Sequence, residues 1–386
     1  MTILVVGAGF AGAVYARQLA EAGYRVHVID MKEHVAGHCH DYMHASGVRV
    51  HRYGPHVFHT SNAKVVGWLS RFTDWVPHEH CVVALLGDGR YVPLPINIDT
   101  VNAMFGVDLK TAEDLSGFLK SVSETRNPIV TAEDQLYKFI GRRLTDHFYR
   151  PYMRKMYQRD LTEIPASVVR RISVRGDSEK RYFPGDAFQA LPKDGYTAMF
   201  ERILGHPRIE VRLGMRFEHA MLSSYEHCFN SMPIDEFFSY RFGELPYRSN
   251  RFHTTVVPAA AAPRHAVIDY TDEGAFVREI WWHNLPGHHV APGPSVVRTV
   301  EEPCDYRDNG MERHYPLRLH DGEADAVYER YRRLAAGIAS VTFIGRCGTY
   351  QYLDMHQVVN QSLAHVGKWC ASRSEARQLA ALGAKA

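Results

Sequence analysis

The sequence lacks several features that would settle its class at once. Only six of its 386 residues are cysteines, and no two of them form a Cys-x-x-Cys pair. Zinc sites and disulfide frameworks use closely and regularly spaced cysteines, so we predict neither, and a reducing compartment is the expected environment. The net charge is only +2 with histidine neutral, and no long run of lysine and arginine occurs. This balance argues against a nucleic-acid partner.

Long apolar segments are also missing. No run approaches the roughly 20 residues that a membrane-spanning helix needs. The apolar N-terminus, MTILVVGAGFAGAVYA, lacks the basic start of a signal peptide and contains three glycines. We therefore expect a cytoplasmic protein with no membrane span. The composition is that of an ordinary globular protein, 45% hydrophobic and 23% charged, and the length predicts roughly two to three domains.

The first thirty residues indicate a dinucleotide-binding domain. The apolar run ILVV predicts a buried parallel strand, GAGFAG (residues 7–12) follows it directly, and a helix-like stretch leads to a second strand that ends at Asp30. Gly7 would permit a tight turn, Gly9 a close approach to a pyrophosphate, and Gly12 close packing of helix on strand. The helix N-terminus attracts phosphates, and Asp30 is placed to accept hydrogen bonds from a ribose diol. Both FAD and NAD are bound in this way.

The later parts of the chain favour FAD. Helical patterns dominate residues 100–157, where Thr111-Ala-Glu-Asp opens one helix and Thr131-Ala-Glu-Asp looks like a capping box for another. Short strand-like runs fill about 208–300, and a buried strand at 341–344 precedes a long helix at about 355–370. The dinucleotide-binding start is thus completed only near the C-terminus. Such a divided cofactor domain is more usual in FAD-dependent enzymes than in NAD dehydrogenases.

Histidines gather soon after the second strand, above all in HRYGPHVFHT (residues 51–60). Their spacing fits no standard zinc pattern and carboxylates are few nearby, so we predict no metal site. His56 and His59 lie next to a Gly-Pro turn, in a segment expected to return toward the cofactor. Arg346 follows a buried strand and a glycine, at a sheet edge where ligands collect.

Asp354 stands at the expected N-cap of the last helix, whose positive end would suit the N1–C2=O edge of an anionic reduced flavin. A plain capping role for Asp354 remains equally open. Arginine and tyrosine recur in positions suited to a diphosphate, because arginine binds it in a bidentate manner and tyrosine adds neutral donors.

Over nearly its whole length the sequence resembles the UDP-galactopyranose mutase family. The stretches that carry the resemblance are, in order, GAGFAG, RYGPHVFHT, PLPINIDT, RISVR, PIDEFFSYRFGELPYRS, AVIDYTD, YPL and GR…YQYLDMHQV. The resemblance implies a redox-neutral isomerase that interconverts UDP-galactopyranose and UDP-galactofuranose, or close analogues. It implies FAD in the reduced form, with NAD(P)H or another external reductant, and a bond between flavin N5 and the sugar as UDP leaves. It also implies a homodimer.

The fold class implied is α/β, with a Rossmann-like FAD-binding domain in discontinuous segments, a helical insertion domain and an antiparallel β-sheet domain. The expected FAD-binding domain comprises residues 1–80 with 195–215 and 325–386. The helical nucleotide-binding domain covers 98–170, the sheet domain covers 81–97 with 216–324, and a mobile active-site loop covers 171–190.

Motifs and resemblance together give three sets of site residues. The predicted catalytic set is Arg175, Arg278, His59, His56 and Asp354. The predicted substrate-binding set is Phe148, Tyr149, Tyr152, Tyr157, Arg175, Phe188, Arg278, His314, Tyr315, Tyr352 and Asp354. The predicted cofactor-binding set is Gly7, Gly9, Phe10, Ala11, Gly12, Asp30, Met31, Gly37, His38, His56, Arg346, Asp354 and Met355. We expect His59 to tune the flavin rather than to move the proton itself.

Several positions depart from the family pattern. A GGNAY-like run is replaced by AGHCH (residues 36–40), the uracil-stacking tryptophan by Tyr157, and a loop tyrosine near the phosphates by Phe188. These departures leave the nucleotide and the sugar open: another base, a deoxy sugar or an amino sugar would change these contacts. Two other functions also stay open. One is a flavin-dependent oxidoreductase of the amine-oxidase kind on the same scaffold, and the other is a non-catalytic relative that binds nucleotide sugars.

Overall fold

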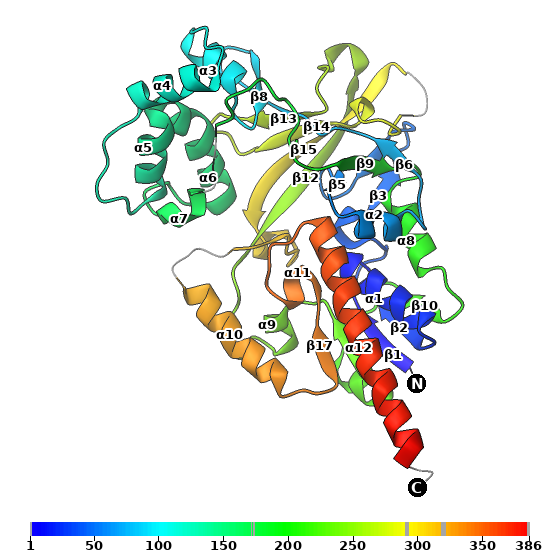
Figure 1. The fold of residues 1–386 in the computed structure, drawn as a ribbon. Coiled ribbons are helices and arrows are strands. Elements are labelled where there is room, and N and C mark those ends of the chain that lie inside the picture. Colours follow the sequence, from blue (N-terminus) through cyan, green and yellow to red (C-terminus); the bar gives the residue numbers. More distant parts are fainter. Residues whose placement is uncertain (1, 171, 173, 290–292, 318–321, 384–386) are drawn as a thin grey trace.

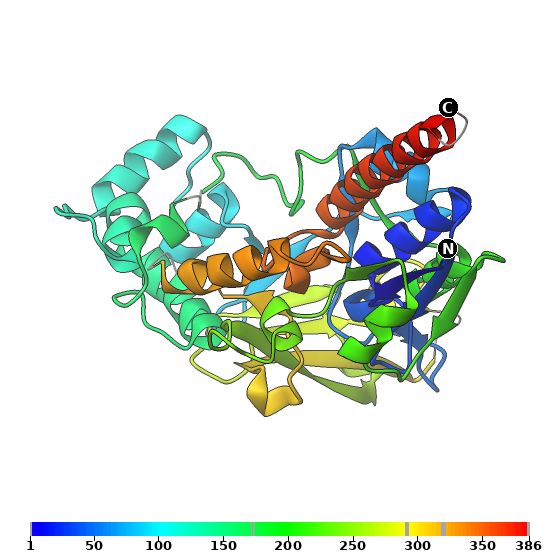
Figure 2. The ribbon, with the colours of Figure 1, turned by 90° about the horizontal axis from the view of Figure 1, so that it is seen from below.

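The computed structural model describes residues 2–170, 172, 174–289, 293–317 and 322–383. Three parts can be distinguished in Figure 1: a parallel sheet flanked by helices, a separate group of helices, and a long twisted sheet. Figure 2 shows the helical part at one end of the molecule and the parallel sheet at the other, with the long sheet lying across both. The predicted α/β class is confirmed.

The parallel sheet has five strands in the order β10-β2-β1-β11-β17, and every neighbouring pair is parallel. In chain order the strands are β1 (Thr2–Val6), β2 (Arg25–Ile29), β10 (Ile209–Arg212), β11 (His227–Asn230) and β17 (Val341–Phe343). Val5 of the central strand lies between Val28 and Phe229, and all three side chains are buried. Apolar side chains fill both faces of such a sheet, which is why ILVV could be recognised as a strand.

Strand β11 corrects the predicted domain boundaries. It lies within residues 216–324, which we assigned to the antiparallel sheet domain, but it pairs with β1 and β17 in the parallel sheet. Its sequence, HCFN, is four residues long and buried throughout. A run this short carries no periodicity that could distinguish the two sheets.

Helices cover the parallel sheet and enclose its core. They are α1 (Phe10–Glu21), α2 (Ala63–Leu69), α8 (Tyr196–Leu204) and α12 (Met355–Gly383). Buried alanines on α1, including Ala13 and Ala16, allow close packing against its neighbours, and α12 runs alongside α1 (Figure 1). Helix α12 is longer than the predicted span of 355–370. Within the described part of the chain, no helix is both long enough and apolar enough to cross a membrane.

The long sheet has seven strands in the order β16-β12-β15-β14-β13-β7-β8. In chain order these are β7 (Val82–Leu85), β8 (Tyr91–Leu94), β12 (Tyr247–Pro258), β13 (Val267–Tyr270), β14 (Arg278–Trp281), β15 (Ser295–Asp305) and β16 (Tyr315–Pro316). β7 and β8 form an antiparallel hairpin around Gly87-Asp88-Gly89. The sheet is mixed rather than wholly antiparallel, because this hairpin joins it through a parallel pairing of β7 with β13.

The helical domain contains α3 (Ile98–Phe105), α4 (Ala112–Val122), α5 (Ala132–Leu144), α6 (Arg150–Tyr157) and α7 (Ala166–Val169), with a π-helical turn at Thr145–Tyr149. The capping box predicted at Thr131 is confirmed, and Thr111 forms a second one. The Thr111 hydroxyl accepts the N–H of Asp114 and the Thr131 hydroxyl that of Asp134, and each aspartate carboxylate accepts the backbone N–H of its threonine.

The end of the predicted mobile loop is a strand. Residues 188–190, which we placed in the loop, begin β9 (Phe188–Pro192), which pairs with β5 (Phe58–Thr60) and β6 (Trp75–Pro77). The pairing brings the last part of the loop beside the HRYGPHVFHT segment. A separate two-stranded ribbon is formed by β3 (Asp41–Met43) and β4 (Arg49–His51), and the short or peripheral helices are α9 (Ile234–Phe237), α10 (Glu323–Ala336) and α11 (Gly345–Gly348).

Candidate active site

One cavity of about 640 Å³ extends from the GAGFAG loop to the edge of the seven-stranded sheet. Every residue of the predicted cofactor-binding set lines it. So do Arg278, Tyr315 and Tyr352 of the predicted substrate-binding set. The structure therefore joins the two predicted sites in a single space, while the individual ligand contacts stay predictions.

The glycine loop at one end of the cavity is sterically constrained. Gly7 has a φ of +103°, and a Cβ atom there would lie 2.0 Å from Oγ of Ser231. A Cβ on Gly12 would lie 1.8 Å from the carbonyl oxygen of Gly7. These distances confirm the steric roles predicted for Gly7 and Gly12, a tight turn and close packing of α1 on β1.

Asp30 holds this loop from the end of β2. Its Oδ2 accepts the backbone N–H of Ala8 at 2.7 Å, and its Oδ1 accepts that of Lys32 at 2.8 Å. Each carboxylate oxygen keeps a second lone pair that is available to a ribose hydroxyl. The contact with a ribose stays a prediction.

The cavity fits a dinucleotide on structural grounds. Gly37 packs against Gly9, since a Cβ on Gly37 would lie 3.2 Å from the Gly9 Cα. Arg346 lines the same cavity, and its buried Nε has no hydrogen-bond partner among the described residues. The backbone of Gly9 and Gly37 carries no side chains and lies beside the N-terminus of α1, and the Nε–H of Arg346 is a cationic donor without a partner in the chain as described. This combination is suited to binding phosphates.

His56 and His59 both face the cavity, but in different settings. Nδ1 of His56 donates to the carbonyl oxygen of Gly54 at 2.9 Å, and burial lowers the pKa of His56 to about 4. His56 is therefore neutral near pH 7. The His59 ring stacks on Phe183 with centroids 3.5 Å apart, and its Nδ1 lies 2.6 Å from Oδ2 of Asp186. The loop after Arg175 is thus attached to His59.

Arg278 is the principal cation at the far end of the cavity. Its Nε and Nη2 donate to the two carboxylate oxygens of Asp269 at 2.5 and 3.0 Å. Although burial opposes it, the Asp269 carboxylate holds the pKa of Arg278 well above its ordinary value. Asp269 therefore fixes the guanidinium and leaves Nη1 for a ligand.

Tyr315, rather than His314, lines the cavity beside Arg278. Its ring stacks on that of Tyr352 with centroids 5.9 Å apart, and the Arg346 guanidinium lies over both rings. His314 is buried behind them, and its carbonyl oxygen accepts a hydrogen bond from Arg346 at 3.0 Å.

Comparison with known proteins agrees with this arrangement. The family model for UDP-galactopyranose mutase matches residues 147–352, and a model for NAD(P)-binding Rossmann-like domains matches residues 5–72. The chain belongs to the UDP-galactopyranose mutase family.

Two relatives match nearly the full length of the chain. One, from Klebsiella pneumoniae and named "Probable UDP-galactopyranose mutase", is 34% identical over 372 residues, which are 96% of this chain and 95% of the relative. Another is the dTDP-fucopyranose mutase of Escherichia coli, 32% identical over 369 residues, 94% of this chain and 96% of the relative. A crystal structure of reduced UDP-galactopyranose mutase has the same fold, with a TM-score of 0.73, 16% identity and coverage of 95% and 94%.

Arg175, a predicted catalytic residue of this family member, lies outside the cavity lining in this structure. Its two Nη atoms donate to the carbonyl oxygens of Arg181 and Tyr182, at 2.6 and 3.0 Å. These bonds brace the loop internally. A contact between Arg175 and a substrate diphosphate stays a prediction, and it requires the loop to change conformation.

The predicted nucleotide-binding aromatic residues lie in the helical domain, outside the cavity lining. Phe148 is buried in the core of that domain, and Tyr149 and Tyr157 pack against the same core. Tyr152 is exposed and lies within electrostatic reach of Arg278. Phe188 also lies outside the cavity lining, because its side chain projects from β9 against Phe58 and Trp75, and its contact with a substrate stays a prediction. The strand pairing places it there.

Several cavity-lining residues were missed in the sequence. They are His80, Tyr182, Phe183, Glu236, Tyr240, Glu312 and Arg313. Tyr182 and Phe183 follow Arg175 closely, so the loop prediction could have included them. Glu236 and Tyr240 lie in the PIDEFFSYRFGELPYRS stretch that carries the resemblance, so that stretch was a signal for them. His80, Glu312 and Arg313 come from segments with no motif of their own, and only the fold brings them to the cavity.

Glu301 is a further buried acid beside Arg278, its partner in the β14–β15 register. Burial raises the pKa of Glu301 to about 7 from an ordinary value of 4.5, although Arg278 opposes the shift. The native state therefore keeps a proton that the unfolded chain releases, and stability falls as pH rises through this window.

We expect Glu301→Gln to be more stable than the wild type at pH 8, by at most about 3 kcal/mol, and of similar stability at pH 4.5. The amide cannot ionise, so its burial carries no charge penalty. Urea unfolding at both pH values measures the difference. An equal difference at the two pH values would show that packing, not ionisation, is responsible.

Proposed function

We propose that the protein interconverts the pyranose and furanose forms of a nucleoside diphosphate sugar, with reduced FAD as its cofactor. The continuity of the cavity is the observation that carries the proposal. A redox-neutral sugar rearrangement on a flavin requires the cofactor and the diphosphate to share one space, and the cavity joins the glycine loop to Arg278 and Tyr315.

When bound and reduced, FAD would supply the electron-rich ring nitrogen that the family's reaction uses. The chain's own residues position the substrate. Arg278, fixed by Asp269, offers its remaining N–H groups to the diphosphate as negative charge develops on it. Tyr182, Tyr315 and Tyr352 add neutral donors and stacking surfaces.

Exclusion of water is the second requirement, because water would hydrolyse the sugar from its diphosphate. Phe183 and Asp186 attach the loop to His59, so the loop covers the cavity where cofactor and sugar would meet. His56 is neutral and fixed by Gly54, and it presents its Nε2 lone pair as an acceptor without adding charge.

Two substrates deserve comparison, because the two relatives bear names with different nucleotides and sugars at similar identity. The decisive assay supplies dithionite-reduced protein with UDP-galactofuranose or dTDP-fucofuranose and separates the products by chromatography. Conversion of either sugar only after reduction supports the proposal. Net oxidation would instead indicate an oxidoreductase, and binding without conversion a non-catalytic relative. The homodimer, the external reductant and the cytoplasmic location also stay proposals.

A further inference from the structure

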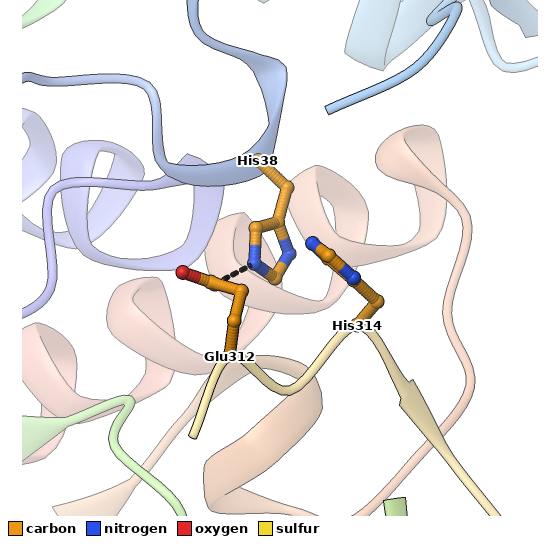
Figure 3. A group of neighbouring side chains, drawn as sticks. All are labelled: His38, Glu312 and His314. Atoms are coloured by element: carbon orange, nitrogen blue, oxygen red, sulfur yellow. Dashed lines mark hydrogen bonds and ion pairs between the residues drawn. The ribbon is translucent and has the colours of Figure 1, made fainter. Parts of the chain in front are cut away.

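His38 occupies the cofactor side of the cavity, in the run that departs from the family's GGNAY-like pattern. It follows Gly37, which packs against Gly9 at the N-terminus of α1. That is where a GxGxxG loop brings the pyrophosphate of its ligand. Nε2 of His38 lies 2.6 Å from Oε1 of Glu312, and its ring is 4.5 Å from that of His314 (Figure 3).

A metal ion is the first ligand that two imidazoles and a carboxylate suggest, and the three groups lie close enough to share one. The hydrogen bonds of His314 argue against it. Nδ1 of His314 accepts the backbone N–H of Asn250 at 2.9 Å, so the ring proton is on Nε2. A metal would need the lone pair that Nε2 then lacks. This Nε2–H is instead a buried donor with no partner in the described part of the chain.

Glu312 determines the proton arrangement of His38. Lys32 pairs with Glu312, and although burial opposes it, His38 and Lys32 lower the pKa of Glu312. The ionised carboxylate accepts the Nε2–H of His38. Burial lowers the pKa of His38, so its Nδ1 carries a lone pair. The titratable and charged groups that surround His38 are Lys32, Tyr53, His56, Glu312, His314 and Arg346.

The lone pair of Nδ1 would repel a phosphate oxygen, whereas an N–H group at the same position would donate a hydrogen bond to it. We propose that the diphosphate of the cofactor binds with uptake of one proton from solvent at Nδ1 of His38. The resulting imidazolium is held by Glu312 on its other nitrogen. The new N–H bond at Nδ1 of His38 is the only covalent change in this step. The inference rests on the proposed FAD-dependent function and specifies the ionisation of its cofactor site.

Proton uptake makes cofactor affinity depend on pH. His38 holds its proton more tightly in the complex than in the free protein. The dissociation constant for FAD therefore rises with pH between these two pKa values, by up to about tenfold per pH unit. The diphosphate itself is fully ionised throughout this range, so the cofactor contributes no proton of its own.

Isothermal titration of the apoprotein with FAD tests the inference, in paired buffers of equal pH but different ionisation enthalpy. We expect uptake of about one proton per FAD between the two pKa values. His38→Asn should abolish the uptake and flatten the pH dependence of the dissociation constant. His34→Asn, in the same segment but outside the cavity lining, is the matched control and should leave both unchanged. ADP-ribose, a probe with the diphosphate but no flavin, should reproduce the uptake, and riboflavin should not.

The possible failures are distinguishable. If wild-type protein binds FAD with no proton uptake at any pH from 6 to 9, the inference is wrong and the proposed mutase function is unaffected. If it binds no FAD at all, the proposed function fails and the inference fails with it. The wild-type titration decides in either case, so the outcome does not depend on the folding of the His38 variant.

Discussion

Replacing Arg278 with glutamine is expected to lower kcat/KM for the nucleotide sugar by about 10²–10³-fold or more. The side chain is a cavity-lining cation whose position is fixed by its two hydrogen bonds to Asp269. Preorganised charge is most effective where negative charge develops in the transition state, and the departing diphosphate is that place. Steady-state kinetics of the reduced enzyme, with the flavin content checked, measure the loss.

Two variants separate catalysis from stability. Arg278→Gln alone leaves Asp269 without its partner, and an unpaired carboxylate that is mostly buried destabilises a fold by about 3–5 kcal/mol. The double variant Arg278→Gln/Asp269→Asn removes both charges, so most of that stability should return while activity stays low. Arg298→Gln is the matched control on neighbouring β15, where Arg298 pairs with Glu279 at 3.6 Å. Recovery of turnover in the double variant would contradict the role of Arg278.

The cofactor half of the protein could be predicted because its determinants are local. Gly7 has a positive φ, a Cβ on Gly12 would meet the carbonyl oxygen of Gly7 in the same loop, and ILVV is buried on both faces of its strand. The same holds for the capping boxes at Thr111 and Thr131, which close within four residues. Where a structural constraint and the residues that satisfy it lie in one short segment, the local structure can be predicted from the sequence alone.

The substrate half depended on contacts between distant segments. Glu301 is an ordinary acid in a strand until β14 brings it beside Arg278 in a buried setting. β11 belongs to the parallel sheet only because it pairs with β1 and β17, which lie far from it in the sequence. Phe188 looked like a loop residue near phosphates because no local signal shows that β9 pairs with β5 and β6.

The active-site loop, residues 171–190, could be predicted from the sequence only in part, for a third reason. We predicted a separate active-site loop, and residues 174–187 do form irregular structure next to the cavity. Sequence could not show which side chains it presents. In the structure Phe183 and Asp186 contact His59, while Arg175 is bonded to the loop's own carbonyls. Which side chains a loop presents to a cavity depends on the loop's conformation, and several conformations are compatible with one sequence.

The second large effect is expected from Gly12→Ala. A Cβ at this position would lie 1.8 Å from the Gly7 carbonyl oxygen, which is backbone and cannot rotate away, so α1 must move off β1. We expect a loss of at least about 3 kcal/mol in unfolding free energy and purification without flavin. Gly67→Ala is the matched control: Gly67 is also helical, but a Cβ there meets nothing within 4 Å. That substitution should stabilise the protein by about 0.5–1 kcal/mol, because alanine is the better helix former. Urea unfolding and the visible absorbance of the flavin measure both variants, and a Gly12→Ala protein with wild-type stability and full flavin content would show that α1 can shift without cost.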